Sequence, residues 1–141
     1  DAVVQLLFNS SKVYVNAHDS LYGRTPLSWT AENGHQKAVL LLLSTHRVDT
    51  NAKDTQHGQK SLSVAAKHGH LDIVTLLVER ESVNINSEDI IGQTPLSWAA
   101  EYGHLEIVNL LAQMEGVDIH SKDDKGRTPL SWALTGRRVK M

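Results

Sequence analysis

The sequence predicts an all-α solenoid built from short helix pairs, and three observations support this prediction. The string Thr-Pro-Leu-Ser-Trp occurs at residues 25–29, 94–98 and 128–132, with a degraded copy at residues 60–64. The four copies begin 35, 34 and 34 residues apart, and a fixed period in this range is typical of solenoid proteins. An apolar segment with helical spacing follows each of the first three copies. The 141 residues are therefore expected to reuse one helical unit.

Each string is expected to begin the first helix of a unit. Thr94 can accept a hydrogen bond from a free amide of the first helical turn, and Pro95 lacks an amide that would have no partner there. Gly103 follows the apolar residues of this segment, and glycine readily adopts the left-handed conformation that ends a helix. Gly34 and Gly69 hold the equivalent places in the other units.

A second helix is expected after each of these glycines. In the clearest unit, apolar residues at positions 105, 107, 108, 110 and 111 are spaced by three and four, which makes one broad apolar face. The counterparts are residues 38–43 and 71–78, and a further segment of this kind occupies residues 2–9.

The connection from one unit to the next is expected to be a β-hairpin-like finger. Short alternating segments at residues 13–16, 48–51, 83–86 and 117–120 each lead to a glycine that can form a turn. The finger is one residue longer before Gly23 and Gly58 than before Gly92 and Gly126, which explains the 35-residue spacing. An insertion is most easily accommodated at a loop tip.

Composition excludes several classes of function. The chain has no cysteine, so disulfides, thiolate catalysis and sulfur-ligated metal sites are excluded, and an intracellular, cytoplasmic location is expected. The net charge of −2 gives no field that would attract nucleic acid or an anionic membrane. The longest apolar run covers residues 38–43, far short of the roughly 20 residues that cross a bilayer.

These residues carry a family resemblance that covers essentially the whole chain. The pattern Gly-x-Thr-Pro-Leu-x-x-Ala-x-x-x-Gly-His, followed by an Ile/Val-Val-x-x-Leu-Leu helix and a Val-Asn tail, resembles the ankyrin repeat. The resemblance implies a single ankyrin-repeat domain over residues 1–141. Its parts would be a partial repeat at 1–22, full repeats at 23–57, 58–91 and 92–125, and a partial repeat at 126–141. The repeated sequence also resembles ankyrin arrays of filamentous fungal multidomain proteins.

The sequence departs from the family pattern at one position of each first helix. Serine occupies the usual place of a histidine at positions 28, 63, 97 and 131, so the hydrogen bond of that histidine should be shortened or missing. The histidines that directly follow the turn glycines, His35, His70 and His104, hold positions for which the resemblance implies a structural hydrogen bond. A metal site at residues 68–70 is the alternative, but it would need three or four converging ligands. We expect no metal, no cofactor and no enzyme activity.

The tryptophans of the repeated string allow two interpretations. Trp29, Trp98 and Trp132 stand where the family places a packed aliphatic residue, so they are expected to pack in the core between units. The alternative is an aromatic surface that contacts a partner. The degraded copy at residues 60–64 lacks both the Thr-Pro start and the tryptophan, which makes it the predicted weak unit of the stack.

The resemblance implies a non-enzymatic protein–protein interaction module that holds a partner on the concave surface of its finger tips and first helices. The residues that vary there between units are the candidate contacts, although tips that vary because they are solvated are the simpler alternative. They are Leu21, Tyr22, Arg24, Glu32, Asn33, His57, Gln59, Lys67, His68, Ile90, Ile91, Gln93, Glu101, Tyr102, Asp124, Lys125 and Arg127.

Two other functions remain open at this stage. The chain could be a regulatory or sensor segment of a larger enzyme or signalling receptor. It could also be a scaffold fragment that self-associates end to end, because both termini stop half-way through a unit and uncapped solenoid ends expose apolar surface.

Overall fold

The computed structural model describes residues 15–45 and 47–135. The expected helix at residues 2–9 and the C-terminal tail at 136–141 lie outside these residues. The described part contains seven helices and no strand, so the predicted all-α solenoid is confirmed. The first helices of the units are α2 (Pro26–Asn33), α4 (Ser61–Lys67), α6 (Pro95–Glu101) and α8 (Pro129–Thr135). The second helices are α3 (Gln36–Leu43), α5 (Leu71–Val78) and α7 (Leu105–Ala112).

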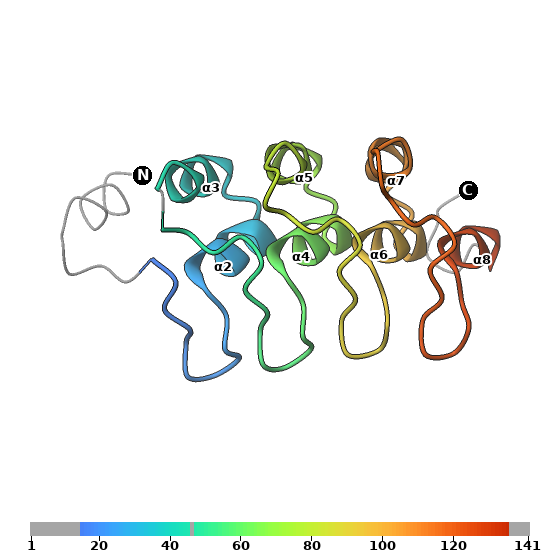
Figure 1. The fold of residues 1–141 in the computed structure, drawn as a ribbon, viewed down its shortest axis with the longest axis horizontal. Helices are drawn as coiled ribbons and strands as arrows, with labels where there is room; N and C mark the ends of the chain where they lie inside the picture. Colours follow the sequence, from blue (N-terminus) through green and yellow to red (C-terminus); the bar gives the residue numbers. More distant parts are fainter. Residues whose placement is uncertain (1–14, 46, 136–141) are drawn as a thin grey trace.

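The helices form two layers. Figure 1 shows α3, α5 and α7 side by side in one layer, and α2, α4, α6 and α8 in the other. The fingers project from the layer of first helices, on the side away from the second helices. Each first helix packs against the next first helix and, in the three pairs, against its own second helix. This arrangement leaves the fingers accessible as a row.

The expected helix boundaries are confirmed by their caps. Thr94 Oγ1 accepts the amide of Ser97 at 3.2 Å, and Thr25 and Thr128 make the same bond at 3.3 and 3.2 Å. At the other end, Gly69 has a φ of +78°, which favours glycine. A Cβ at Gly69 would also lie 2.6 Å from the ring of His104, so glycine is required there for space as well.

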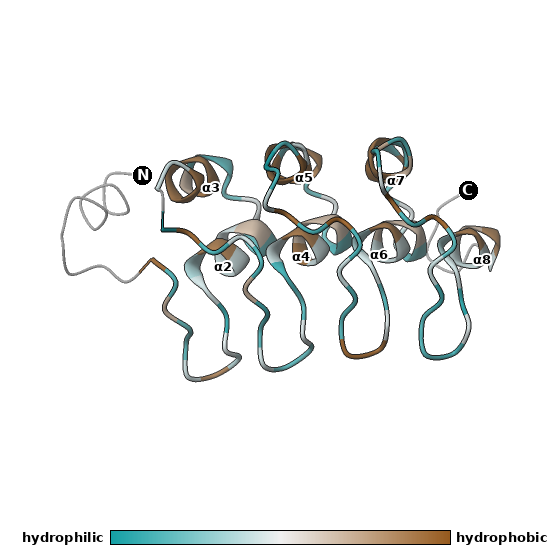
Figure 2. Cartoon of the chain, in the orientation of Figure 1, coloured by the Kyte–Doolittle hydropathy of each residue, from teal (hydrophilic) through white to brown (hydrophobic). Residues whose placement is uncertain are grey.

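The core lies between the two layers. Its most deeply buried members come from both: Leu27 and Leu62 from first helices, and Val39, Ile73 and Leu77 from second helices, each at most 2% exposed. Figure 2 shows that the second helices α3, α5 and α7 carry both apolar and polar residues. The periodic apolar residues of the sequence thus hold neighbouring units together.

The degraded copy forms a first helix all the same. Lys60 has φ −95° and ψ 165°, which matches the extended conformation of the capping threonines, but no side-chain cap bond is formed at this helix. Residues 61–66 of α4 are all buried. Packing between two neighbouring units therefore substitutes for the missing cap.

Replacing Lys60 with threonine is expected to raise the free energy of unfolding by about 1 kcal/mol, the usual contribution of a helix cap. The backbone already has the conformation that a cap needs, and burial together with the nearby charge of Lys53 lowers the pKa of Lys60, so the lysine is not well accommodated. Denaturant unfolding checks this prediction. Lys53→Thr is the matched control, since it removes a neighbouring charge without creating a cap. An equal gain from the control would show that charge, and not capping, is responsible.

An equivalent backbone hydrogen bond closes each finger at its tip. The bond runs from Asp19 N to Arg24 O in the first finger and from Asp54 N to Gln59 O in the second, at 2.9 Å in both. In the third and fourth fingers it closes over one residue fewer, at 89–93 and 123–127. The additional residue of the longer units therefore lies in the tip, as expected.

Neighbouring fingers are also tied to one another. Thr55 N donates to Tyr22 O and Ile90 N donates to His57 O, both at 3.0 Å, and Asp124 N donates to Ile91 O at 2.9 Å. Near the second helices, asparagine side chains form further hydrogen bonds between neighbouring units. Asn51 Oδ1 accepts the amide of Asn84 at 3.1 Å and Asn86 Oδ1 accepts that of Asp118 at 2.8 Å. Neighbouring fingers are thus joined by hydrogen bonds both at their tips and near their bases.

Candidate functional site

The surface formed by the four finger tips and by the side of the first helices that faces them is called the finger face below. An aspartate organises it in each unit: Asp19, Asp54, Asp89 and Asp123. Asp89 Oδ1, for example, accepts the amides of Ile91 at 3.1 Å and Gln93 at 2.9 Å. In the first finger, the hydrogen bond from the amide of Tyr22 lowers the pKa of Asp19, although burial opposes the shift.

The second carboxylate oxygen joins the finger to a tryptophan of the first helix. Trp98 Nε1 donates to Asp89 Oδ2 at 2.8 Å, and Trp29 Nε1 makes the same bond to Asp19. In the fourth finger, Arg127 Nε donates to Asp123 Oδ2 at 2.7 Å instead. Burial raises the pKa of Asp123, but the hydrogen bonds from Arg127 and Lys125 have the larger combined effect in the opposite direction. The pKa of Asp123 therefore lies below its ordinary value.

The interpretation of the tryptophans as core residues is therefore wrong in part. Trp98 is 8% exposed and Trp132 is 4% exposed, but Trp29 is only half-buried, and none of the three belongs to the apolar core cluster. Each ring packs on the finger face, because the tryptophan lies on the side of the first helix that faces the finger. Trp29 and Trp98 link their helices to the fingers by hydrogen bonds, whereas Trp132 Nε1 is buried without a partner in the described structure.

A cation covers each tryptophan ring. The guanidinium of Arg24 lies 4.9 Å from the ring centre of Trp29 and that of Arg127 lies 4.2 Å from Trp132. Lys67 Nζ lies 4.6 Å from the ring centre of Trp98, and this lysine comes from the preceding unit. Cation–π contacts of this kind are worth about 0.5–2 kcal/mol each. The finger face is consequently lined by alternating aromatic rings and positive charges.

The acidic and histidine candidates lie next to these cations. Glu32 pairs with Arg24, and its other oxygen lies 3.5 Å from His68 Nε2. Burial lowers the pKa of His68, while the charge of Glu32 opposes the shift. His68 stacks on His70 with ring centres 6.4 Å apart. The cluster joins the C-terminal ends of α2 and α4.

Three of the predicted contact residues are not accessible, and the expectation for them is wrong. Gln59, Gln93 and Glu101 are 4, 1 and 6% exposed. Gln59 Nε2 donates to Asp89 Oδ2, and Gln93 Nε2 donates to Glu101 Oε1, both at 3.4 Å. These polar side chains form hydrogen bonds under the finger face.

The other candidates remain on the surface. Asn33, His57, His68, Ile90, Ile91, Asp124 and Lys125 are exposed, as is Leu21, and Tyr22, Arg24, Glu32, Lys67, Tyr102 and Arg127 are half-buried. Leu21, Ile90 and Ile91 keep 73, 65 and 40% of their surface exposed at finger tips. Sequence reasoning missed the organising aspartates, although positions 19, 54, 89 and 123 recur at the repeat period.

The histidines after the turn glycines connect successive units. His70 Nε2 bonds Glu32 O at 2.8 Å and His104 Nε2 bonds Lys67 O at 2.9 Å, which confirms the structural role expected for these two residues. His35 is exposed and makes no such bond within the part of the chain that the structure describes. In the first helices, Ser28 Oγ is buried and has no partner in the described structure, so the hydrogen bond expected to be lost is absent at this position.

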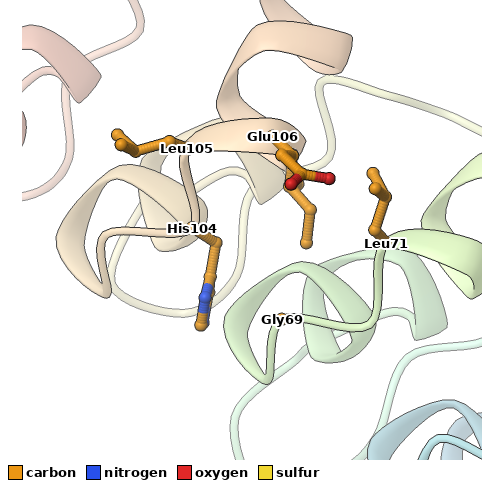
Figure 3. Close-up of a pocket in the computed structure, with 6 residues that line it drawn as sticks. Gly69, Leu71, His104, Leu105 and Glu106 are labelled. Carbon is orange, nitrogen blue, oxygen red and sulfur yellow. The ribbon is translucent and has the colours of Figure 1, made fainter.

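His104 also lines a cavity of about 270 Å³ between the second and third units, with Gly69, Leu71, Leu105, Glu106 and Ile107. Figure 3 shows Glu106 and Leu71 next to one another and His104 on the other side of the group, while Leu105 points away from it. The cavity offers one imidazole and one carboxylate. Within the described ranges, no three histidine, aspartate or glutamate side chains are grouped so that they could hold a metal ion.

A second, apolar cavity of about 320 Å³ lies at the α8 end of the solenoid. It is lined by Val108 and Ala112 of α7, by Leu130 and Ala133 of α8, and by Leu96, Ala100, Ile119, His120, Thr128 and Pro129. Leu130 and Leu134 are 65 and 78% exposed, and α8 is the last helix within the described residues. This end of the stack therefore presents apolar surface.

The family follows from a comparison with protein-family models. A model described as ankyrin repeats (3 copies) matches residues 1–89 and 62–141, which together span the chain. The chain belongs to the ankyrin-repeat family. Ankyrin repeats are generally protein–protein interaction modules and are generally non-catalytic. A search of curated proteins found no match to this ankyrin-repeat chain. None of its described helices is both long and apolar enough to cross a bilayer.

Proposed function

We propose that this ankyrin-repeat chain binds a protein partner through the finger face and catalyses no reaction. The observation that carries the proposal is the set of large apolar side chains at the finger tips, Leu21, Ile90 and Ile91. Figure 2 shows the apolar colour at the tip of the third finger. Solvation alone does not explain aliphatic residues at such positions, whereas desolvation by a partner would stabilise a complex.

The remaining accessible candidates suit the same role. Tyrosine and arginine are favoured at the energetic centres of interfaces, and Tyr22 and Arg24 lie together with the guanidinium 5.5 Å from the tyrosine ring centre. The cross-links between fingers hold these side chains in place before a partner arrives. Less conformational entropy is then lost on binding.

Replacing both Ile90 and Ile91 with serine is expected to weaken partner binding by about tenfold or more, because two exposed aliphatic contacts are removed from the interface. Capture of proteins from extract of the source cells, followed by titration of the captured partner, measures the effect. Leu105→Ser is the matched control, since Leu105 is 68% exposed but lies at the start of a second helix. A partner that is lost with the control and retained by the double variant would contradict the proposal.

End-to-end self-association is a second candidate function, and the apolar cavity beside α8 favours it. Another copy could cover Leu130 and Leu134 and continue the stack, since solenoid units are stabilised by their neighbours. Sedimentation velocity over a wide concentration range tests this candidate. A single monomeric species at every concentration would contradict it.

We also propose an intracellular, cytoplasmic location. The lack of cysteine supports it, because a reducing compartment gives no use for disulfides. Fractionation of source cells with an antibody against the chain would test this location, and recovery from the extracellular medium would contradict it.

A further inference from the structure

Lys67 differs from the other two cations that cover tryptophans. Arg24 pairs with Glu32, and Arg127 pairs with Asp123 at 2.7 Å. Among the described residues, no carboxylate oxygen lies within 4.0 Å of Lys67 Nζ. Its ammonium lies instead over two aromatic rings, 4.6 Å from the centre of Trp98 and 6.0 Å from that of Tyr102. The finger face thus contains a positioned cation whose charge is not neutralised locally.

The acidic groups at the ends of the neighbouring first helices and in the third finger have other partners. Glu32 is shared between Arg24 and His68, and Glu101 is buried and accepts from Gln93. Asp89 accepts four hydrogen bonds, from Trp98, Gln59 and two amides of its own tip. An additional carboxylate brought to Lys67 would therefore meet a half-buried ammonium, where attraction is stronger than between fully solvated charges.

The cation and an apolar tip belong to one continuous surface. Lys67 rests on Trp98, and Trp98 Nε1 is bonded to Asp89. Ile90 and Ile91 directly follow Asp89 and are 65 and 40% exposed. A positive charge and two exposed aliphatic side chains are therefore connected through the same tryptophan, the charge by its contact with the ring and the aliphatic side chains through Asp89.

We propose that the partner contacts this surface with an acidic segment, in which an aspartate or glutamate lies beside a bulky aliphatic residue. The partner's carboxylate pairs with Lys67, and its aliphatic side chain packs on Ile90 and Ile91. This inference rests on the proposed function and adds the chemistry of the partner. The aromatic rings hold the ammonium in position, so little side-chain entropy is lost when the carboxylate binds.

Peptide display against the folded chain tests the inference, with a library of random 12-residue peptides as the probe. We expect the selected peptides to contain Asp or Glu beside Leu, Ile or Val. Lys67→Met should weaken their binding by about tenfold, while Lys67→Arg should retain it within about threefold. Lys125→Met is the matched control, because Lys125 is an exposed lysine of the fourth finger tip, and it should change binding by less than about twofold.

A double-mutant cycle identifies the contact. Replacing the peptide's glutamate with glutamine should weaken binding to the native chain but not to the Lys67→Met variant. An equal loss in both, or selected peptides without acidic residues, overturns the inference. If the selected peptides lack acidic residues but lose affinity when Ile90 and Ile91 are replaced, the proposed function stands and only the inference about an acidic segment is wrong. A library that yields no binder contradicts both. Unchanged circular dichroism and melting temperature of each variant show that folding is preserved.

Discussion

Replacing Trp98 with alanine is expected to lower the free energy of unfolding by about 3–5 kcal/mol, the usual loss when a large buried aromatic ring is removed. The ring is 8% exposed, packs 5.9 Å from the ring centre of Tyr102 and carries Lys67 on its face. Its Nε1 donates to Asp89 at 2.8 Å. The substitution would therefore remove packing and disconnect the third finger from α6.

Denaturant unfolding followed by circular dichroism measures this loss. Trp98→Phe separates its two parts, because phenylalanine keeps most of the packing but cannot donate to Asp89, and it should lose about 1–2 kcal/mol. Trp29→Ala is a second comparison and should lose less than Trp98→Ala, since Trp29 is only half-buried. An unfolding free energy of Trp98→Ala close to the native value would show that the ring contributes little to the fold.

Replacing Asp89 with alanine is expected to lower the free energy of unfolding by about 3 kcal/mol, whereas the same change at Asp54 should cost about 1 kcal/mol. Both aspartates accept an amide of their own finger tip, at 2.9 Å from Gln93 and 2.7 Å from His57. Only Asp89 also accepts a tryptophan Nε1. Asp54 Oδ2 is buried without a partner in the described structure, and valine stands at position 64, where the other units have tryptophan.

The pair of substitutions distinguishes two roles of the finger aspartate. Losses that differ as expected would show that the additional hydrogen bonds of Asp89, from Trp98, Gln59 and the amide of Ile91, contribute most of the stabilisation. Equal losses would show that closing the tip is the dominant role, and that the bond to Trp98 is of minor importance. The same denaturant experiment gives both values.

The fold could be predicted from local signals. The Thr-Pro start, the glycine after each first helix and the apolar spacing of the second helices act within one unit, and the observed helices begin and end where these residues placed them. The extra residue of the longer fingers was also located correctly, because a tip is the one place where it breaks no packing. Each of these features depends on neighbours in the sequence.

The finger face was predicted less well, because its contacts cross from one unit to the next. Lys67 lies on Trp98 of the following unit, and Gln59 donates to Asp89 of the following finger. The identity of one residue therefore decides the burial of another about 30 positions away. Variation between units could not separate Gln59 and Gln93, which are buried, from Ile90 and Ile91, which are exposed.

The proposal that a partner lies on the finger face is tested most directly by hydrogen exchange of the chain with and without the partner that it captures. We expect slower exchange of amides in the finger tips, at residues 19–24, 54–59 and 89–93, and in the adjoining ends of α4 and α6. Exchange in the second helices α3, α5 and α7 should not change. Protection confined to the second helices, with finger tips that exchange as in the free chain, would contradict it.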